Sequence, residues 1–392
     1  MRAAKPKSTV LKRRGAGAKA PRHPLARDNE VPPVTNEPVI NEPVTDESYR
    51  RPSATADARR RPLTMDDIAR LANVDKSTVS RALAGNKLVT EETREHVRRI
   101  AEEQGYIVNS VASGLRSRKS KVIAVVVPLA HDARQSLSDP FFMELVGNLA
   151  DRFAEHGYDL LLSKVPRPNS SWITSLYQSR KADGVVLIGQ SLEHEHISDA
   201  GRQGIPLVVW GARIRDQAYI SVGTNNRQGA MLATQHLIDK GRRKIAFVGD
   251  WRVPEIAQRH EGYLAALRES GLPAHPDLTA ETHFEPDAAF EAVDQLITRV
   301  PGLDGIVASS DVIAMAAIRA LAARKLRVPE DVSVTGFDDI ALASQTSPPL
   351  TTVRQDIPRG AVLLTERIMA SMEGKPVRSI EMKPTLVVRG SS

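Results

Sequence analysis

The side chains best suited to chemistry follow one another within VDKSTVSRAL, residues 74–83. They are small hydroxyl groups and cations, at Lys76, Ser77, Thr78, Ser80 and Arg81. Such groups donate and accept hydrogen bonds, which suits contact with the edges of DNA bases in the major groove. The segment therefore favours nucleic-acid recognition, provided that the surrounding chain presents these residues on an exposed face.

Two short helices joined by a tight turn would present them. Thr64 is suited to cap a first helix, and Asp66 and Asp67 fall in the first turn, where acidic residues stabilise a helix. Apolar residues recur at helical spacing, at Ile68, Ala69, Leu71 and Ala72. Asn73 tolerates the left-handed backbone of a tight turn. The pattern predicts a helix that ends at this turn.

A second and a third helix are predicted to follow. Asp75 can cap the second helix, whose apolar face carries Val79, Ala82 and Leu83. The third is expected over residues 88–106, with Thr90 as its cap and an apolar face. Three helices with a polar second helix indicate a helix-turn-helix unit. The alternative is a small helical bundle whose polar face only meets water.

The first 61 residues differ in composition from the rest of the chain. Residues 1–27 contain nine basic residues and no acidic one, and residues 28–48 contain six acidic residues and no basic one. The net charge of the whole chain, +7, is already reached at residue 62. A segment so rich in proline and polar residues is predicted to be disordered. A basic tail could add salt-sensitive DNA affinity; the alternatives are a passive leader or a start codon placed too far upstream.

Composition narrows the class of protein. With 392 residues and 41% hydrophobic residues, the chain can form two or three domains with real cores. It contains no cysteine, which excludes disulfides and fits a reducing cytoplasm. No apolar run approaches the ~18 residues that would span a membrane, and the N-terminus lacks the apolar core of a signal peptide.

An enzyme is not expected, nor is a cofactor. The sequence has no glycine-rich phosphate loop, no cluster of metal ligands and no G-x-S-x-G nucleophile elbow. His194 and His196 lie two residues apart in a predicted helix, so they face different sides and would not bind one metal ion together. The ten histidines are otherwise scattered.

From residue 122 onward, apolar β-branched runs alternate with amphipathic segments. Strands are predicted at 122–128, 158–163, 184–189, 205–210, 244–249, 279–283, 304–308 and 331–336, with helices between them. This alternation indicates an α/β fold with doubly wound parallel sheets. About 270 residues divide more naturally into two lobes than into one sheet. Ligands in such folds bind beyond the carboxyl ends of the strands, so the loops after Val127, Gly189, Gly249 and Ser309 are the expected cleft.

Several motifs in this order resemble the LacI/GalR family of bacterial transcriptional regulators, which includes the lactose and purine repressors. The motifs are VDKSTVSRAL, ASGLRS, VIAVVVP, DPFF, QRHEGY, ASSDVIAMAAIRAL, VPEDVSVTGFDD and SPPLTTVRQD. The resemblance runs from about residue 63 to residue 390. It implies a helix-turn-helix domain over residues 62–108, a hinge helix and linker over 109–121, and a two-lobed, periplasmic-binding-protein-like effector and dimerisation domain over 122–392.

The resemblance also implies a homodimer that binds a palindromic DNA operator. Lys76 and Ser77 match the positions that reach base edges, with Thr78 nearby. The expected phosphate contacts are Thr64, Ser80, Arg81 and Asn86; helix capping and surface solvation are the alternative. The family often has serine where this chain has Asp75. The aspartate would place a negative charge near the DNA phosphates.

The resemblance implies that the hinge helix folds on the DNA and lies in the minor groove. Leu115 matches the position that inserts between bases and kinks the duplex, although a leucine read alone is more often a core residue. Ala112 would let two hinge helices approach closely, and Asn109 is retained. The family commonly has proline where Val108 stands here.

In the effector domain, the resemblance assigns ligand contacts to Phe142, Arg259 and Asp311. An aspartate can accept from two hydroxyl groups while an arginine donates a planar fork; the alternative is an ordinary surface or helix-capping ion pair. Trp210 could stack on a sugar or be a buried structural residue. Many relatives have aspartate near Gly211, so lactose or purine specificity does not transfer directly.

We therefore expect a ligand-responsive transcriptional regulator that is cytoplasmic and associated with the nucleoid. The main hypothesis is a repressor of carbohydrate uptake or catabolism genes that a sugar inducer releases from DNA. The alternative is a regulator that needs a purine or other metabolite as corepressor. A free sugar-binding protein would need an export signal, and a DNA-organising protein would not need a cleft. With no heptad repeat at the C-terminus, a dimer is favoured over a tetramer.

Overall fold

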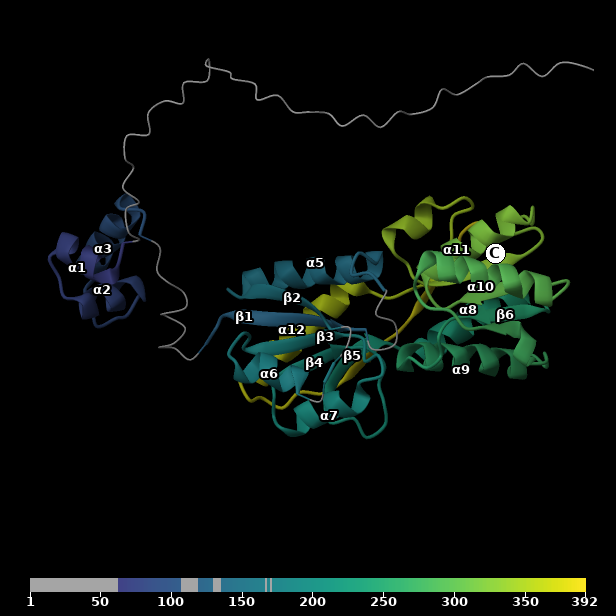
Figure 1. The fold of residues 1–392 in the computed structure, drawn as a ribbon, viewed down its shortest axis with the longest axis horizontal. Helices are drawn as coiled ribbons and strands as arrows, with labels where there is room; N and C mark the ends of the chain where they lie inside the picture. Colours follow the sequence, from purple (N-terminus) through teal and green to yellow (C-terminus); the bar gives the residue numbers. More distant parts are fainter. Residues whose placement is uncertain (1–62, 107–118, 130–134, 166–167, 170) are drawn as a thin grey trace, which may run out of the picture.

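The computed structural model describes residues 63–106, 119–129, 135–165, 168–169 and 171–392 (Figure 1). The first described segment forms three helices: α1 (Met65–Ala72), α2 (Lys76–Leu83) and α3 (Glu91–Glu103). Ile68, Val79 and Val97, one from each helix, are fully buried against one another. The expected helix-turn-helix unit is present. Leu71, expected in its apolar core, is instead 53% exposed, and the inward face of α1 is formed by Asp67, Ile68, Ala69 and Ala72.

The turn and the caps follow from local residue chemistry. Asn73 ends α1 with a φ of 51°, the left-handed conformation expected for it. Thr64 and Asp67 form a reciprocal capping box at the start of α1, and Thr90 caps α3. Asp75 occupies the capping position of α2, but its side chain makes no capping hydrogen bond, contrary to expectation. This side chain is exposed, so water can satisfy it.

The rest of the described chain forms two lobes, each built on a six-stranded sheet. In lobe 1 the strand order is β11-β5-β4-β3-β1-β2 and all pairings are parallel. Its strands are β1 (Val122–Pro128), β2 (Asp159–Val165), β3 (Gly184–Ile188), β4 (Leu207–Trp210), β5 (Ile220–Thr224) and β11 (Ile380–Met382). Its helices are α5 (Pro140–Glu155), α6 (Trp172–Gln178), α7 (His194–Arg202) and α12 (Ile357–Met372).

Lobe 2 repeats this plan with the order β12-β10-β9-β8-β6-β7, and only β12 runs antiparallel to its neighbour. Its strands are β6 (Ile245–Val248), β7 (Thr279–Ala280), β8 (Gly305–Ala308), β9 (Ser333–Asp338), β10 (Thr351–Arg354) and β12 (Thr385–Val387). Its α-helices are α8 (Asn226–Asp239), α9 (Pro254–Glu269), α10 (Pro286–Arg299) and α11 (Asp311–Ala323), with 3-10 helices at Pro276–Leu278 and Ala341–Gln345.

Each sheet is covered by helices on both faces, as a doubly wound fold requires. In lobe 1, alternate residues of β1 pack in two directions: Ile123 and Val125 face α5 and α12, while Ala124 and Val126 face α6 and α7. In lobe 2, α10 and α11 cover one face, and α8 and α9 cover the other. The continuous apolar strands seen in the sequence are therefore buried on both sides.

The chain passes between the lobes three times, after β5, after β10 and after β11, so α12 and β11 return to lobe 1 late in the sequence (Figure 1). The alternating pattern did not predict β5, β10, β11, β12 or α12. Among the described residues, no helix is both long enough and apolar enough to cross a membrane.

Candidate functional site

The polar face of α2 is presented as the sequence predicted. Lys76, Ser77 and Arg81 are exposed, and Thr78 and Ser80 are partly buried, while Val79 and Ala82 point into the three-helix core. One face of α2 thus anchors the helix, and the other offers hydroxyl groups and cations to a partner. The width of an α-helix matches the major groove of B-DNA.

Lys76 is held by a weak interaction that a partner can replace. Its Nζ lies 2.7 Å from Asp66 Oδ2, and both side chains are more than half exposed. Exposed ion pairs of this kind contribute about 0–1 kcal/mol. Lys76 can therefore leave Asp66 for a base edge at small cost.

Two of the expected phosphate contacts also have structural roles. Thr64 Oγ1 donates to Asp67 Oδ2 at 2.7 Å and accepts from the Asp67 backbone N–H at 3.4 Å. Asn86 Oδ1 accepts from the Leu88 backbone N–H at 2.9 Å, which fixes the turn after α2. Both side chains are exposed as well, so capping and contact with phosphate are compatible.

The three residues expected in the hinge helix, Asn109, Ala112 and Leu115, lie outside the described residues. Their assignment to the minor groove stays a prediction from the resemblance.

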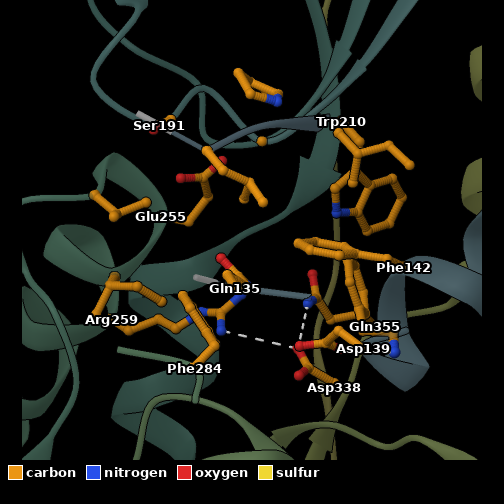
Figure 2. A pocket seen from close by; sticks show the side chains of 17 residues that line it. Gln135, Asp139, Phe142, Ser191, Trp210, Glu255, Arg259, Phe284, Asp338 and Gln355 are labelled. Carbon is orange, nitrogen blue, oxygen red and sulfur yellow. Dashed lines mark hydrogen bonds and ion pairs between the residues drawn. The ribbon is translucent and has the colours of Figure 1, made fainter. Parts of the chain in front are cut away.

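The second candidate site is a cleft between the two lobes (Figure 2). The space between its walls, counted to its open mouth, is about 620 Å³. Its polar lining comes from both lobes, at Gln135, Asp139, Ser191, Glu255, Arg259, Asp338 and Gln355. Its aromatic lining is Phe141, Phe142, Trp210 and Phe284. Apolar walls with a few polar groups are typical of small-molecule sites.

Arg259 is fixed in this cleft by partners on several sides. It extends from α9, where Nε donates to Asn226 Oδ1 at 2.8 Å and Nη1 donates to the Ser309 carbonyl oxygen at 2.5 Å. The guanidinium lies 3.7 Å from the centre of the Phe337 ring. Burial lowers the pKa of Arg259, while the nearby Asp338 opposes this shift. The guanidinium is therefore a preorganised donor.

The carboxylate that faces Arg259 is Asp338, which the sequence analysis did not single out. Nη1 of Arg259 lies 3.8 Å from Asp338 Oδ1, and Gln355 Nε2 donates to the same oxygen at 2.7 Å (Figure 2). Burial raises the pKa of Asp338 to about 7, although Arg259 and the Gln355 hydrogen bond act against the shift. The residue ends β9 within GFDD, so the rule that ligands bind beyond strand ends could have found it.

Asp311, expected to pair with Arg259, has a different position. It is fully buried and is not among the residues that line the cleft. Its Oδ1 accepts from Thr352 Oγ1 at 2.5 Å, and its Oδ2 accepts from the Ile340 backbone N–H at 2.9 Å. Burial raises its pKa well above the ordinary value, and the nearby Asp338 adds to the shift. The cap of α11 is Ser310 rather than Asp311.

The two expected aromatic residues do line the cleft. Phe142 projects from the first turn of α5, and Trp210 ends β4. Trp210 is only 4% exposed and packs against Phe141, with 6.0 Å between ring centres, and against Gly360, where a Cβ atom would lie 2.1 Å from the indole. Trp210 is thus a buried structural residue whose indole also forms part of the cleft wall, and its stacking on a sugar stays a prediction.

Gly211 leaves room for a pair of polar side chains next to Trp210. A Cβ atom there would lie 2.2 Å from Gln190 Oε1 and 2.8 Å from Glu255 Oε1. Gln190 is fully buried, and its Oε1 accepts from the Ala212 backbone N–H at 3.0 Å. The Gln190 backbone N–H donates to Glu255 Oε1 at 3.2 Å, which joins lobe 1 to α9 of lobe 2. The lack of a side chain at Gly211 therefore leaves the space that the Gln190 amide and the Glu255 carboxyl group occupy.

Comparisons with known families match the two parts of the chain separately. Residues 64–109 match the family described as "Bacterial regulatory proteins, lacI family". Residues 234–392 match the family described as "Periplasmic binding protein-like domain".

Among curated proteins, the chain is 32% identical over 336 residues to the ribose operon repressor of Haemophilus influenzae, covering 84% of this chain and 98% of that protein. It is 31% identical over 337 residues to the HTH-type transcriptional repressor CytR of Escherichia coli, covering 84% of this chain and 96% of CytR. Among solved structures, a complex of the transcriptional regulator CelR with cellobiose matches with a TM-score of 0.63 and 28% identity, covering 84% of this chain and 100% of that one.

Proposed function

Because the chain belongs to the LacI family of bacterial transcriptional regulators, we propose that it represses carbohydrate genes from a DNA operator and responds to a sugar in its cleft. The protein would act as a homodimer on a palindromic operator, in the cytoplasm where the chromosomal DNA is. The α2 face of each subunit would enter one major groove. Lys76 and Ser77 would contact bases, and Arg81 and Asn86 would contact phosphates.

The proposal that the cleft binds a sugar rests on the Arg259–Asp338 ion pair, which lies between aromatic walls. A planar donor beside an acceptor matches the adjacent hydroxyl groups of a sugar. Phe142 and Trp210 offer surfaces for the apolar face of the ring. The cellobiose in the CelR complex belongs to that regulator and supports the class of ligand, not its identity.

The charges of the cleft favour an effector without a phosphate group. Among the described lining residues, Asp139, Glu255 and Asp338 are acidic and Arg259 is basic. An anionic effector would meet three carboxyl groups and a single cation, whereas a neutral effector could donate its hydroxyl groups to the carboxyl oxygens. We therefore propose a neutral saccharide.

The proposed mechanism couples the two sites through the lobes. Closure of the cleft on the sugar would shift lobe 1 of one subunit against that of its partner, and the hinge segments could no longer both fold on DNA. Each ligand would then bind one of two states of the dimer more tightly, and their effects would be reciprocal.

A thermal-shift screen of the full chain against neutral saccharides, their phosphates and purines tests the effector class. A ligand that binds only the folded state raises the melting temperature by mass action. We expect a shift with a neutral saccharide and none with its phosphate. A shift with purines alone would instead favour a corepressor, because the Trp210 wall would also suit a flat base.

A selection of duplexes from a randomised pool tests the DNA half. The expected product is a palindrome bound by the wild-type chain. Enrichment of no common sequence would count against operator recognition.

A further inference from the structure

A single carboxylate in lobe 1 binds the last residues before β1. Asp183, which precedes β3, accepts at Oδ1 from the Ser120 backbone N–H (2.7 Å) and from Ser120 Oγ (2.9 Å). Its Oδ2 accepts from the Lys121 backbone N–H at 2.9 Å. Hydrogen bonds to an ionised acceptor are stronger than those between neutral groups. Two consecutive residues of the chain are thus fastened to lobe 1 by one side chain.

These residues are the entry of the chain into the effector domain. The chain leaves α3 at residue 103 and reaches Ser120 through residues 107–118, which lie outside the described part. Lys121 has a φ of 59°, a left-handed kink immediately before β1, and its Nζ lies 4.5 Å from the centre of the Tyr158 ring. The hydrogen bonds that hold Ser120 and Lys121 therefore determine where the linker to the DNA-binding domain leaves lobe 1.

Lobe 2 contains an equivalent set of hydrogen bonds at its corresponding strands. Asp304 precedes β8, and its carboxylate accepts from the backbone N–H groups of Arg243 and Lys244, both at 2.8 Å. These residues lead into β6, which has no DNA-binding domain ahead of it. Lobe 2 thus shows what an aspartate at this position does for strand entry alone.

The hydrogen bonds of Asp183 and those of Asp304 differ in how far toward the N-terminus they extend. The backbone N–H of Asp183 donates to the Val122 carbonyl oxygen, and that of Asp304 donates to the Lys244 carbonyl oxygen, so Val122 and Lys244 correspond. In lobe 2, Asp304 accepts from the backbone N–H groups of Lys244 and of Arg243, the residue before it. In lobe 1, Asp183 accepts from the backbone N–H groups of Lys121 and Ser120, the two residues before Val122, and also from the Ser120 hydroxyl group. The contacts in lobe 1 are thus shifted by one residue toward the linker.

We infer that Asp183 is a positioning residue for operator binding, because it fixes the end of the DNA-domain linker on lobe 1. The inference rests on the proposed function, since it concerns how movement of lobe 1 reaches the DNA-binding helices. A linker held at Ser120 moves with the lobe. A linker released there would no longer follow the lobe from Ser120 onward.

Asp183→Asn in the full chain tests this role. The amide keeps one acceptor but turns a donor toward a backbone N–H, so at least one hydrogen bond to the linker is lost. With more of the linker to order on DNA, the Kd for a duplex selected by the wild-type chain should rise roughly tenfold or more. The effector-induced change in that Kd should shrink, while the thermal shift given by the saccharide found in the screen stays as in the wild type.

Asp304→Asn is the matched control, because the same substitution removes the same kind of hydrogen bond from lobe 2. It should lower the melting temperature to a similar extent and leave the Kd for the selected duplex unchanged. Ser120→Ala removes the hydroxyl bond to Asp183 and the longer bond of 3.3 Å that the Val122 backbone N–H donates to the same hydroxyl oxygen, and it should raise that Kd by a smaller factor. Both linker variants are compared with the wild type at temperatures where each is folded.

An unchanged duplex Kd in folded Asp183→Asn, or an equal loss in Asp304→Asn, overturns the positioning role. If Asp183→Asn does not fold, Ser120→Ala decides: an unchanged Kd overturns the role, and a raised Kd supports it. A wild-type chain that selects no duplex overturns the proposed function and the inference together, whereas the variant results bear on Asp183 alone.

Discussion

At the scale of single residues, the sequence identified three side chains that line the cleft, Arg259, Phe142 and Trp210. It did not single out Asp338, the carboxylate that pairs with the Arg259 guanidinium. Asp311, the predicted acidic ligand contact, is not among the residues that line the cleft, and its contact with a ligand stays a prediction. Asp311 instead bonds Thr352 and Ile340, so we expect its removal to act first on the stability of lobe 2.

Asp338 should make the stability of the unliganded protein depend on pH. Its pKa of about 7 in the folded state lies above that of an unfolded aspartate, so its contribution is fully present below about pH 4 and is lost as the pH rises to about 7. The loss is about 1.4 kcal/mol per unit within that window. Arg259, Asp139 and Asp311 are the titratable groups that act on it.

Melting temperatures of wild type and Asp338→Asn between pH 4 and pH 8 check this expectation. The asparagine does not titrate, so the variant should lose less stability as the pH rises. Some decline should remain, because burial also raises the pKa of Asp311. Parallel curves for the two proteins would contradict the assignment.

Gly211 should tolerate no larger side chain while Gln190 and Glu255 keep their places. Gly211→Ala puts a methyl group 2.2 Å from Gln190 Oε1, which is held in a buried hydrogen bond. We expect a destabilisation of about 1–3 kcal/mol, as for other overpacked sites, and a weakened thermal shift with the effector. Gly147→Ala, a helical site in α5 with nothing within 4 Å of the added Cβ, is the control and should be neutral or stabilising. Equal behaviour of the two variants would rule out the proposed crowding.

At the scale of elements, hydrophobic patterning predicted the long helices and the buried strands and missed the short strands. The strand β5 contains a serine and a glycine, and β11 and β12 span three residues each, so none of them has a period that stands out. β5 pairs with the preceding strand β4 and with the distant β11, and β12 pairs with β10, so their strand character comes from pairing rather than from their own residues. The return of α12 to lobe 1 is likewise a property of the chain path rather than of its own residues.

The capping box of α1 allows a test that separates stability from DNA contact. Thr64→Ala removes the Thr64–Asp67 bonds and should cost about 1 kcal/mol of stability. Thr90→Ala removes the corresponding cap of α3 and should cost a similar amount. If Thr64 also contacts phosphate, only its variant should bind the selected duplex more weakly when both are folded. Equal duplex affinities would leave Thr64 with a capping role alone.

At the scale of the whole molecule, the exposed face of α2 and the cleft between the lobes belong to one chain, and the linker before β1 connects them. Residues 63–120 carry ten basic and eight acidic residues, so we expect DNA binding to depend on specific contacts more than on bulk charge. The Gln190–Glu255 hydrogen bond joins the two lobes at the cleft, and the Arg259–Asp338 pair lies on its lobe 2 side. Lobe 1 in turn holds the linker through Asp183. The order of these parts could be predicted from the sequence, whereas the contacts between them depend on the fold.

Recognition of the operator and its release by a sugar are tested together by a titration of the selected duplex with the wild-type chain, measured by fluorescence anisotropy, with and without the saccharide found by thermal shift. We predict tight binding that a scrambled duplex of equal length does not show, and a Kd that the saccharide raises at least roughly tenfold. Lys76→Ala should lose the preference for the selected duplex but keep the thermal shift with the saccharide. Equal affinity for selected and scrambled duplexes, or a Kd that the saccharide leaves unchanged, would contradict the account.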